Sequence, residues 1–303
     1  MAWTTSYEIS RPYEGFLSWW LEGTYGDDTN KSSASDVAEV INSARFETGE
    51  VNRYYRSIDS FKISKTTQSI IDYMFHLEYH VQHDDNILTY LMGLDANDHA
   101  WNLGFELGVN TSGTTDTFYT LKGCKVKTCE ANGSEGEGWL ITADFSVKDV
   151  AIAAAQASSK TTDAGSVVDG DLCMFNIAGS IQADGADVAD VLQNFTVRVD
   201  NNLDDMWSVG SRYKERAIRT AVDYTGSADI SIDDGGNPHL TDVINHNEAT
   251  SIVIQMAHTG SGAPKITLTD TRWDSGIIDA AGQTEGIIES CPFTSTNLVV
   301  ATS

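Results

Sequence analysis

The segment IIDYMFHLEYHV, residues Ile70 to Val81, decides the fold class of this 303-residue chain. Phe75, Leu77, Tyr79 and Val81 alternate with polar residues, which is the period of a strand with one buried face. Similar short runs rich in Thr, Ser, Val, Ile and aromatic residues recur between clusters of Gly, Asn and Asp. We therefore predict a mainly β protein.

A related pattern returns about half a chain later. AVDYTGSADISI, residues 221–232, aligns with the opening segment and places Asp223-Tyr224 on Asp72-Tyr73. Three further windows align in the same order: residues 39–46 with 190–197, 102–113 with 251–262, and 136–152 with 284–300, the last placing Phe293 on Phe145. Ordered windows at nearly constant spacing indicate an internal duplication. The sequence predicts two tandem β-sandwich or half-barrel units, each with a short flanking helix.

The flanking helix of the first unit is predicted in DDNILTYLMG, residues 84–93. Its Asp residues are suited to capping, Ile87, Leu88 and Leu91 share one face, and a Gly ends it. In the second unit, PHLTDVIN at residues 238–245 takes the same place, with Pro suited to a first helical turn.

A stretch of small and polar residues, Ala153 to Asp171, separates the two copies and predicts a linker or an exposed loop. The predicted organisation is an N-terminal arm at residues 1–35, a first β unit at 36–155, a linker at 156–170 and a second β unit at 171–303.

The arm is rich in aromatic residues. Such density indicates a segment that packs either on its own domain or on a neighbouring subunit. The candidate subunit contacts are Trp3, Tyr7, Phe16, Trp19 and Trp20.

The chain is strongly acidic, with 44 acidic against 19 basic residues and a net charge of −25. A surface of this kind cannot neutralise many phosphates, which argues against a sequence-reading DNA binder. The acidity would repel a polyanion that must slide past, or keep a protein hydrated in concentrated salt. The excess of Asp over Glu and the scarcity of Lys favour a halophilic source. Because no run of about 18 apolar residues and no signal-peptide pattern occurs, we expect a soluble protein without membrane insertion.

Motifs for metal binding or catalysis are weak. On a strand, His76 and His80 share a face but lie about 13 Å apart, too far to hold one ion directly. The acidic clusters at 199–205 and 232–237 lack the full EF-hand spacing, and turns explain them equally well. We expect no metal, no cofactor and no enzymatic activity. The cysteines are predicted as free buried thiols, with a Cys124 to Cys129 link left open; they are Cys124, Cys129, Cys173 and Cys291.

The stretch VRVDNNLDDMWSVGSRYKERAIRTAVDYTGSADISIDD, residues 197–234, resembles the tail tube protein of siphoviruses. The C-terminal run CPFTSTNLVVATS is similar to the last strand of that family. The matching positions in the first stretch are Val199, Asn201, Asn202, Leu203, Gly210, Arg212, Ile218, Thr225 and Gly226.

The resemblance implies a structural virion protein, assembled in the host cytoplasm, whose stacked rings form a tube. It also implies contacts with other tail proteins and passage of double-stranded DNA without specific binding. If single-unit relatives form hexameric rings, a fused pair would form a trimer with pseudo-sixfold symmetry.

Other functions stay open at this point. A secreted or cell-surface carbohydrate-binding β-sandwich would also be acidic, aromatic and duplicated, but the absence of a signal-peptide pattern argues against it. Tail terminators and distal tail proteins share the fold type, and a metal-dependent hydrolase would require a ligand cluster that the sequence does not supply.

Overall fold

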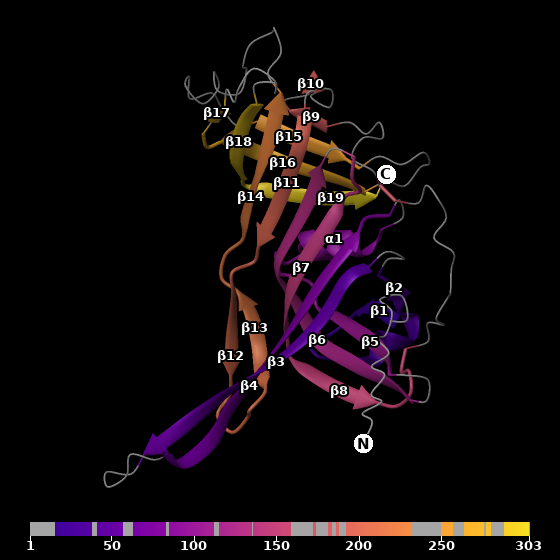
Figure 1. Cartoon of the computed structure of the whole chain (residues 1–303), viewed down its shortest axis with the longest axis vertical. Coiled ribbons are helices and arrows are strands. Elements are labelled where there is room, and N and C mark those ends of the chain that lie inside the picture. The colour runs from indigo at the N-terminus through magenta and orange to yellow at the C-terminus, as the bar shows by residue number, and fades with distance from the viewer. Residues whose placement is uncertain are drawn as a thin grey trace, which may run out of the picture.

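The computed structural model describes residues 16–37, 41–56, 63–82, 85–111, 115–134, 136–158, 172–173, 181–183, 186–187, 192–231, 250–256, 264–275, 277–279 and 288–302 (Figure 1). The protein is mainly β, as the alternation predicts. The first half holds β1 (Phe16–Leu21), β2 (Ser35–Asp36), β3 (Ile41–Arg56), β4 (Ile63–His80), β5 (Leu103–Thr111), β6 (Thr115–Ser134), β7 (Leu140–Val147) and β8 (Asp149–Ala153). A 3-10 helix, η2 (Thr29–Ser33), and one α-helix, α1 (Ile87–Met92), also lie in this half.

The second half holds β9 (Ile181–Ala183), β10 (Ala186–Asp187), β11 (Leu192–Asp200), β12 (Leu203–Trp207), β13 (Lys214–Arg219), β14 (Asp223–Ser231), β15 (Thr250–Gln255), β16 (Pro264–Trp273), β17 (Ile277–Asp279), β18 (Ile288–Ser295) and β19 (Asn297–Thr302). The helix predicted at residues 238–245 lies outside the described residues.

One antiparallel sheet runs through both halves, and we call it the long sheet. Its strand order is β3–β4–β7–β6–β11–β14–β18, followed by an edge that β17 and the last two residues of β16 form together. Two smaller sheets form the second layer, with the orders β2–β1–β5–β6–β8 and β10–β9–β15–β16–β19. β6 and β16 are long enough to belong to both layers. The architecture is a β-sandwich, as predicted.

The strand pairings of the two halves repeat in the same order. β3, β4, β7 and β6 pair as β11, β14, β18 and the β16–β17 edge do, while β1, β5 and β8 surround β6 as β9, β15 and β19 surround β16. A bulge follows Ile41 in β3 and Leu192 in β11, each at its matching place. Gly123 of β6 and Asp270 of β16 also match, and both are left-handed, with φ of 62° and 52°.

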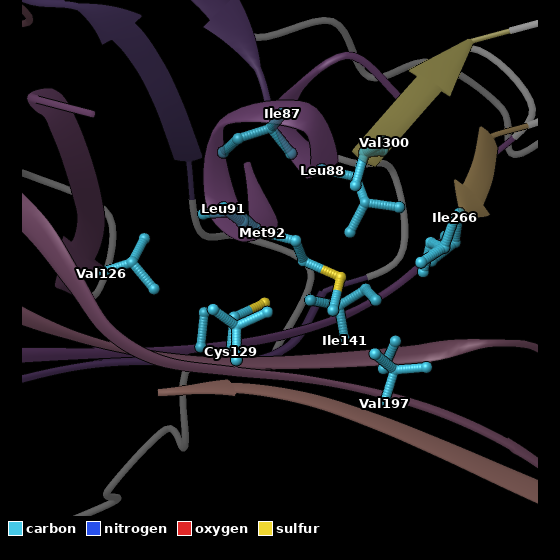
Figure 2. Packing of buried hydrophobic residues seen from close by; sticks show 14 of the residues in the cluster. Ile87, Leu88, Leu91, Met92, Val126, Cys129, Ile141, Val197, Ile266 and Val300 are labelled. Carbon is cyan, nitrogen blue, oxygen red and sulfur yellow. The ribbon is translucent and has the colours of Figure 1, made fainter. Parts of the chain in front are cut away.

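The two halves share one hydrophobic core. Figure 2 shows the buried side chains of α1, among them Leu88 and Met92, beside Cys129 and Ile141 of the first half. Val197, Ile266 and Val300 of the second half join the same cluster. The helix of one half therefore packs between strands of both halves, so the halves do not fold around separate cores.

The opening segment and the first helix have the structure predicted for them. Phe75, Leu77 and Tyr79 are buried in β4, and Val81 is buried just beyond its end. In α1, Ile87, Leu88 and Leu91 are buried on one face. The capping role falls to one Asp, because Asp85 Oδ1 accepts a hydrogen bond from the Leu88 backbone nitrogen at 3.2 Å.

Candidate functional site: a polar sheet face and its edges

The outer face of the long sheet is polar in both halves. Alternate residues point away from the core, and strand register places them in rows, one of which contains Arg45, His76, Asp144 and Thr128. His76 Nδ1 lies 2.8 Å from Asp144 Oδ1, and Thr128 Oγ1 donates to Asp144 Oδ2 at 3.1 Å. Carboxylates outnumber cations among the described residues of this face: Glu47, Asp72, Glu78, Glu130, Asp144, Asp200, Asp223 and Asp229 stand against Arg45, Lys125, Lys127, Arg198 and Arg272.

The junction between β6 and β11 joins the two halves within the long sheet. Its register runs from Thr128 opposite Asp200 to Ser134 opposite Asn194. On the polar face, Thr196 Oγ1 donates to Asn132 Oδ1 at 2.8 Å. Further along, Arg198 Nη1 lies 3.4 Å from Glu130 Oε2, whereas on the core face the buried Val197 lies opposite the buried Ala131. The junction is thus polar outside and apolar inside, like the rest of the sheet.

The hairpin β12–β13 lies on the polar face of the first half. It is anchored by Lys214, whose side chain is 1% exposed. Lys214 Nζ lies 3.0 Å from Asp72 of β4 and 2.8 Å from Asp205 of β12, and it also donates to Ser146 of β7. The Ile71 backbone nitrogen donates to the Arg212 carbonyl at 2.9 Å. The hairpin, a segment of the second half, is therefore anchored to the polar face of the first half. It lies beside a pocket lined by charged residues of both signs.

The predicted subunit contacts of the arm fall into two groups. Trp3 and Tyr7 lie outside the described residues, and Phe16 begins β1, which pairs with β5 along its length. Trp19 and Trp20 are buried inside the chain. Trp19 packs on Tyr90 with ring centroids 5.3 Å apart, while the ring of Trp20 lies so close to Gly104 that a Cβ there would meet it at 2.1 Å. These two residues pack on their own domain, and a subunit contact by the arm stays a prediction.

The residues that carried the family resemblance have structural roles. Asn201 is buried, and its amide nitrogen Nδ2 donates to the Val126 carbonyl at 3.0 Å, which fixes the end of β11 to β6. Asn202 and Gly210 have positive φ, 42° and 90°, at the turns before β12 and between β12 and β13. Gly226 is required because a Cβ would lie 2.2 Å from the Phe293 ring. The remaining positions lie in or between these strands: Val199, Leu203, Arg212, Ile218 and Thr225.

The residues examined for metal chemistry take ordinary places. His76 and His80 lie on β4, as predicted, and the turn at 199–205 is held by Asp200 Oδ1, which accepts from the Asn202 backbone nitrogen at 2.9 Å. Of the acidic cluster 232–237, nothing falls within the described residues. The part of the chain that the structure describes holds no group of three or more His, Cys, Asp and Glu able to share an ion. All four cysteines are free and buried.

The sequence matches the family model described as phage tail tube protein over residues 9–295. The chain belongs to the phage tail tube protein family. A comparison with curated proteins found no match. The family is a structural one rather than an enzyme family, and it makes this tail tube protein a component of the virion that associates with itself and with other tail proteins. Within the described residues, no helix is long and apolar enough to cross a membrane.

Sequence reasoning missed two residues that the structure of the tail tube protein singles out. Lys214 stands in no motif, and its burial depends on contacts with three other strands. Ile152 of β8 is 68% exposed, although it occupies the place of the buried Val300 in β19. The sequence repeat does pair Ile152 with Val300. Only the structure, however, shows that one of the two side chains is exposed and the other buried.

Proposed function

We propose that three copies of this chain close a ring with pseudo-sixfold symmetry, and that stacked rings form the tail tube of a siphovirus-type particle. The tube conducts the viral DNA during ejection, after assembly of the tail in the host cytoplasm. The single observation that carries the proposal is the repetition of the strand pairings, with matching bulges, in the two halves of one chain. A chain that holds two tube units supplies two sixths of a six-unit ring.

We take the repeated pairings as support for an internal duplication of the tube unit. The pairings of β4 and β14 support the same alignment as the sequence, because Tyr73 lies opposite Val147 and Tyr224 lies opposite Ser295 at matching places. The first unit begins with β1 rather than after the arm, since β1 pairs with β5 as β9 pairs with β15. The arm is thereby shortened to the residues before Phe16, and the linker at 156–170 still separates the units.

The ring would have room for a channel. Each chain contributes eight strand positions to the long sheet, so three chains give a closed sheet of roughly 24 strands, and barrels of about 16–18 strands already enclose an aqueous channel. At about 4.8 Å between strands and the usual tilt, the backbone diameter is roughly 45–50 Å. The polar face of the long sheet would line this channel, and the apolar face would stay in the sandwich.

The acidic surface would serve DNA passage by repulsion. The described part of the polar face is richer in carboxylates than in cations, so a duplex would slide without adhering. The net charge of −25 also suits a halophilic host, in which acidic surfaces stay hydrated. The repulsion of DNA is tested by measuring the binding of double-stranded DNA to assembled tubes at low salt. Tight binding would contradict a repelling lumen. A stability that rises steadily with KCl concentration supports the halophilic origin.

The stoichiometry is tested by electron microscopy and native mass spectrometry of the purified protein. We expect hollow tubes, and rings released from them with about three times the 32.9 kDa mass of the chain. Rings of six chains, or a protein that stays monomeric under conditions of tail assembly, would contradict the proposal.

A further inference from the structure

The two edges of the long sheet differ in length and lie at opposite ends of its strand order. Among the described residues, β3 pairs only with β4, and β17 pairs only with β18. β3 is a 16-residue strand, and such a long edge with free backbone groups is a ready template for another strand. The long sheet is therefore open where a ring would have to close.

The junction between β6 and β11 shows how such a closure can be built. β11 of the second half occupies the place of β3, and the last part of β6 occupies the place of β17. Leu140 of β7 and Ile288 of β18 match in the repeat. Asn132 lies opposite Leu140 and Asp279 lies opposite Ile288, so Asn132 and Asp279 occupy matching places. Likewise, Thr196 of β11 matches Arg45 of β3.

We propose that the β17 edge of one copy pairs antiparallel with β3 of the next copy, in the register of the β6–β11 junction. This inference rests on the proposed function and specifies its subunit contact. Because Thr196 lies opposite Asn132, Arg45 of one copy lies opposite Asp279 of the other. Because Val197 lies opposite Ala131, Phe46 lies opposite Ile278.

Burial on β3 supports a missing neighbour. Val197 in β11 is completely buried, whereas Phe46 at the matching place in β3 is only half-buried. The same holds for Phe195, which is buried, and Ala44, which is half-buried. The core-facing side chains of β3 thus lack the cover that β6 gives to β11.

Charge supports the proposed register. The Arg45 side chain is 65% exposed and its only described ion pair is with Glu47 on its own strand, at 2.9 Å. The register brings a residue of opposite charge, Asp279, directly across from Arg45 in the other copy. Opposite charges on facing strand positions stabilise a pair, and like charges destabilise it.

Ile152 provides a second, independent observation. Val300 of β19 is 8% exposed and belongs with α1 of the preceding unit to one cluster, whereas Ile152 at the matching place in β8 is 68% exposed. Among the described residues, β8 of the first unit has no such cover over Ile152. In the proposed ring, the second unit of the neighbouring copy lies next to the first unit on its β3 side. One subunit contact would therefore cover both β3 and Ile152.

The register is tested with pairs of cysteines under mild oxidation. Facing strand residues lie about 4.5–5.5 Å apart between Cα atoms, which a disulfide can span. We expect Arg45→Cys with Asp279→Cys to give covalent dimers and trimers, but no larger species, from assembled tubes. Asn132→Cys with Thr196→Cys is the matched control and links within one chain. Ser43→Cys with Asp279→Cys, two residues out of register, gives at least about fivefold less intermolecular product, because its Cα atoms lie about 7–8 Å apart.

Charge exchange gives the second measurement. We expect Arg45→Asp and Asp279→Arg each to lower the assembled fraction about tenfold, and the double exchange to restore it, because like charges across an interface are strongly repulsive. Three-chain rings that link through the 43/279 pair, or not through 45/279, would overturn this register and leave the proposed function intact. Failure of the unmodified chain to form three-chain rings would overturn the proposed function itself.

Discussion

β11 and β3 occupy the same place in the two halves of this tail tube protein, but among the described strands only β11 has neighbours on both sides. β6 seals β11 and buries Val197 completely, whereas the matching Phe46 of β3 keeps part of its surface exposed. β19 and β8 differ in the same way, through Val300 and Ile152. The difference shows that the second half is covered by the first, and that the first half lacks an equivalent cover within the described chain.

The largest expected effect comes from placing a charge at the two matched positions of β19 and β8. Val300→Asp buries a carboxylate in the shared core and should lower the free energy of unfolding by about 4 kcal/mol or more, measured by chemical denaturation. Ile152→Asp at the exposed counterpart should change monomer stability by less than about 0.5 kcal/mol but abolish tube growth. Equal effects of the two substitutions on monomer stability would remove the basis of the comparison.

A glycine in the second half takes the place of a buried aromatic residue in the first. Gly226 of β14 matches Phe75 of β4, and the Phe293 ring lies where a side chain at position 226 would be, 2.2 Å from its Cβ. Gly226→Ala should destabilise the protein by about 3 kcal/mol through overpacking, measured by thermal or chemical unfolding. Gly49→Ala in β3, where the nearest atom lies at 3.6 Å, is the matched control and should be nearly neutral. A neutral Gly226→Ala would show that the packing around Phe293 is loose.

The hairpin β12–β13 provides another comparison, because this segment of the second half covers part of the polar face of the first half. Lys214→Met removes the buried cation and leaves Asp72 and Asp205 without their partner, which should cost about 2 kcal/mol of stability. Lys31→Met breaks a partly exposed pair with Asp28, which keeps Lys122 as a second partner at 2.9 Å, and should cost less than about 0.5 kcal/mol. Chemical denaturation of both variants measures the difference, and similar losses would mean that Lys214 does not anchor the hairpin.

The last prediction concerns the pH dependence of stability and a buried carboxyl group of the first half. Glu22, just after β1, accepts hydrogen bonds from the backbone nitrogens of Gly26 and Gly123, both at 2.8 Å, and burial raises its pKa from 4.5 to about 7. A raised carboxyl pKa stabilises the fold below pH 4.5, and that contribution is lost as pH rises to about 7.

Glu22→Gln should therefore flatten the dependence of stability on pH between 4.5 and 7, by at most about 1.4 kcal/mol per pH unit. Melting temperatures of both proteins across this range measure the slope. Parallel pH profiles would show that Glu22 does not titrate in this window.

Much of the local structure could be predicted from the sequence, because period-two alternation reports one buried face directly. The alignment of Asp72-Tyr73 with Asp223-Tyr224 agrees with the strand pairings. The window at 102–113 was misplaced by two residues: Phe105 and Ile252 lie opposite the matching Leu121 and Leu268, whereas the sequence alignment set Phe105 on Ile254. A shift of two leaves the same faces buried, so alternation could not reveal it.

The shared core and the anchoring of the β12–β13 hairpin by Lys214 could not be predicted, because both depend on contacts between segments that are distant in the sequence. Nothing in DDNILTYLMG indicates that Val300 will lie against the helix. Lys214 is one of several charges in its hairpin, and only the fold brings Asp72 to it. Trp19 and Trp20 suggested an arm because aromatic density alone does not distinguish a core strand from a contact surface.

Cryo-electron microscopy of assembled tubes would show the ring and the contacts between its chains directly. We expect three chains per ring, a pseudo-sixfold arrangement of their halves, and a continuous inner sheet in which β17 of each chain lies beside β3 of the next. Rings of six chains, or three-chain rings in which the long sheet is interrupted between subunits, would contradict it.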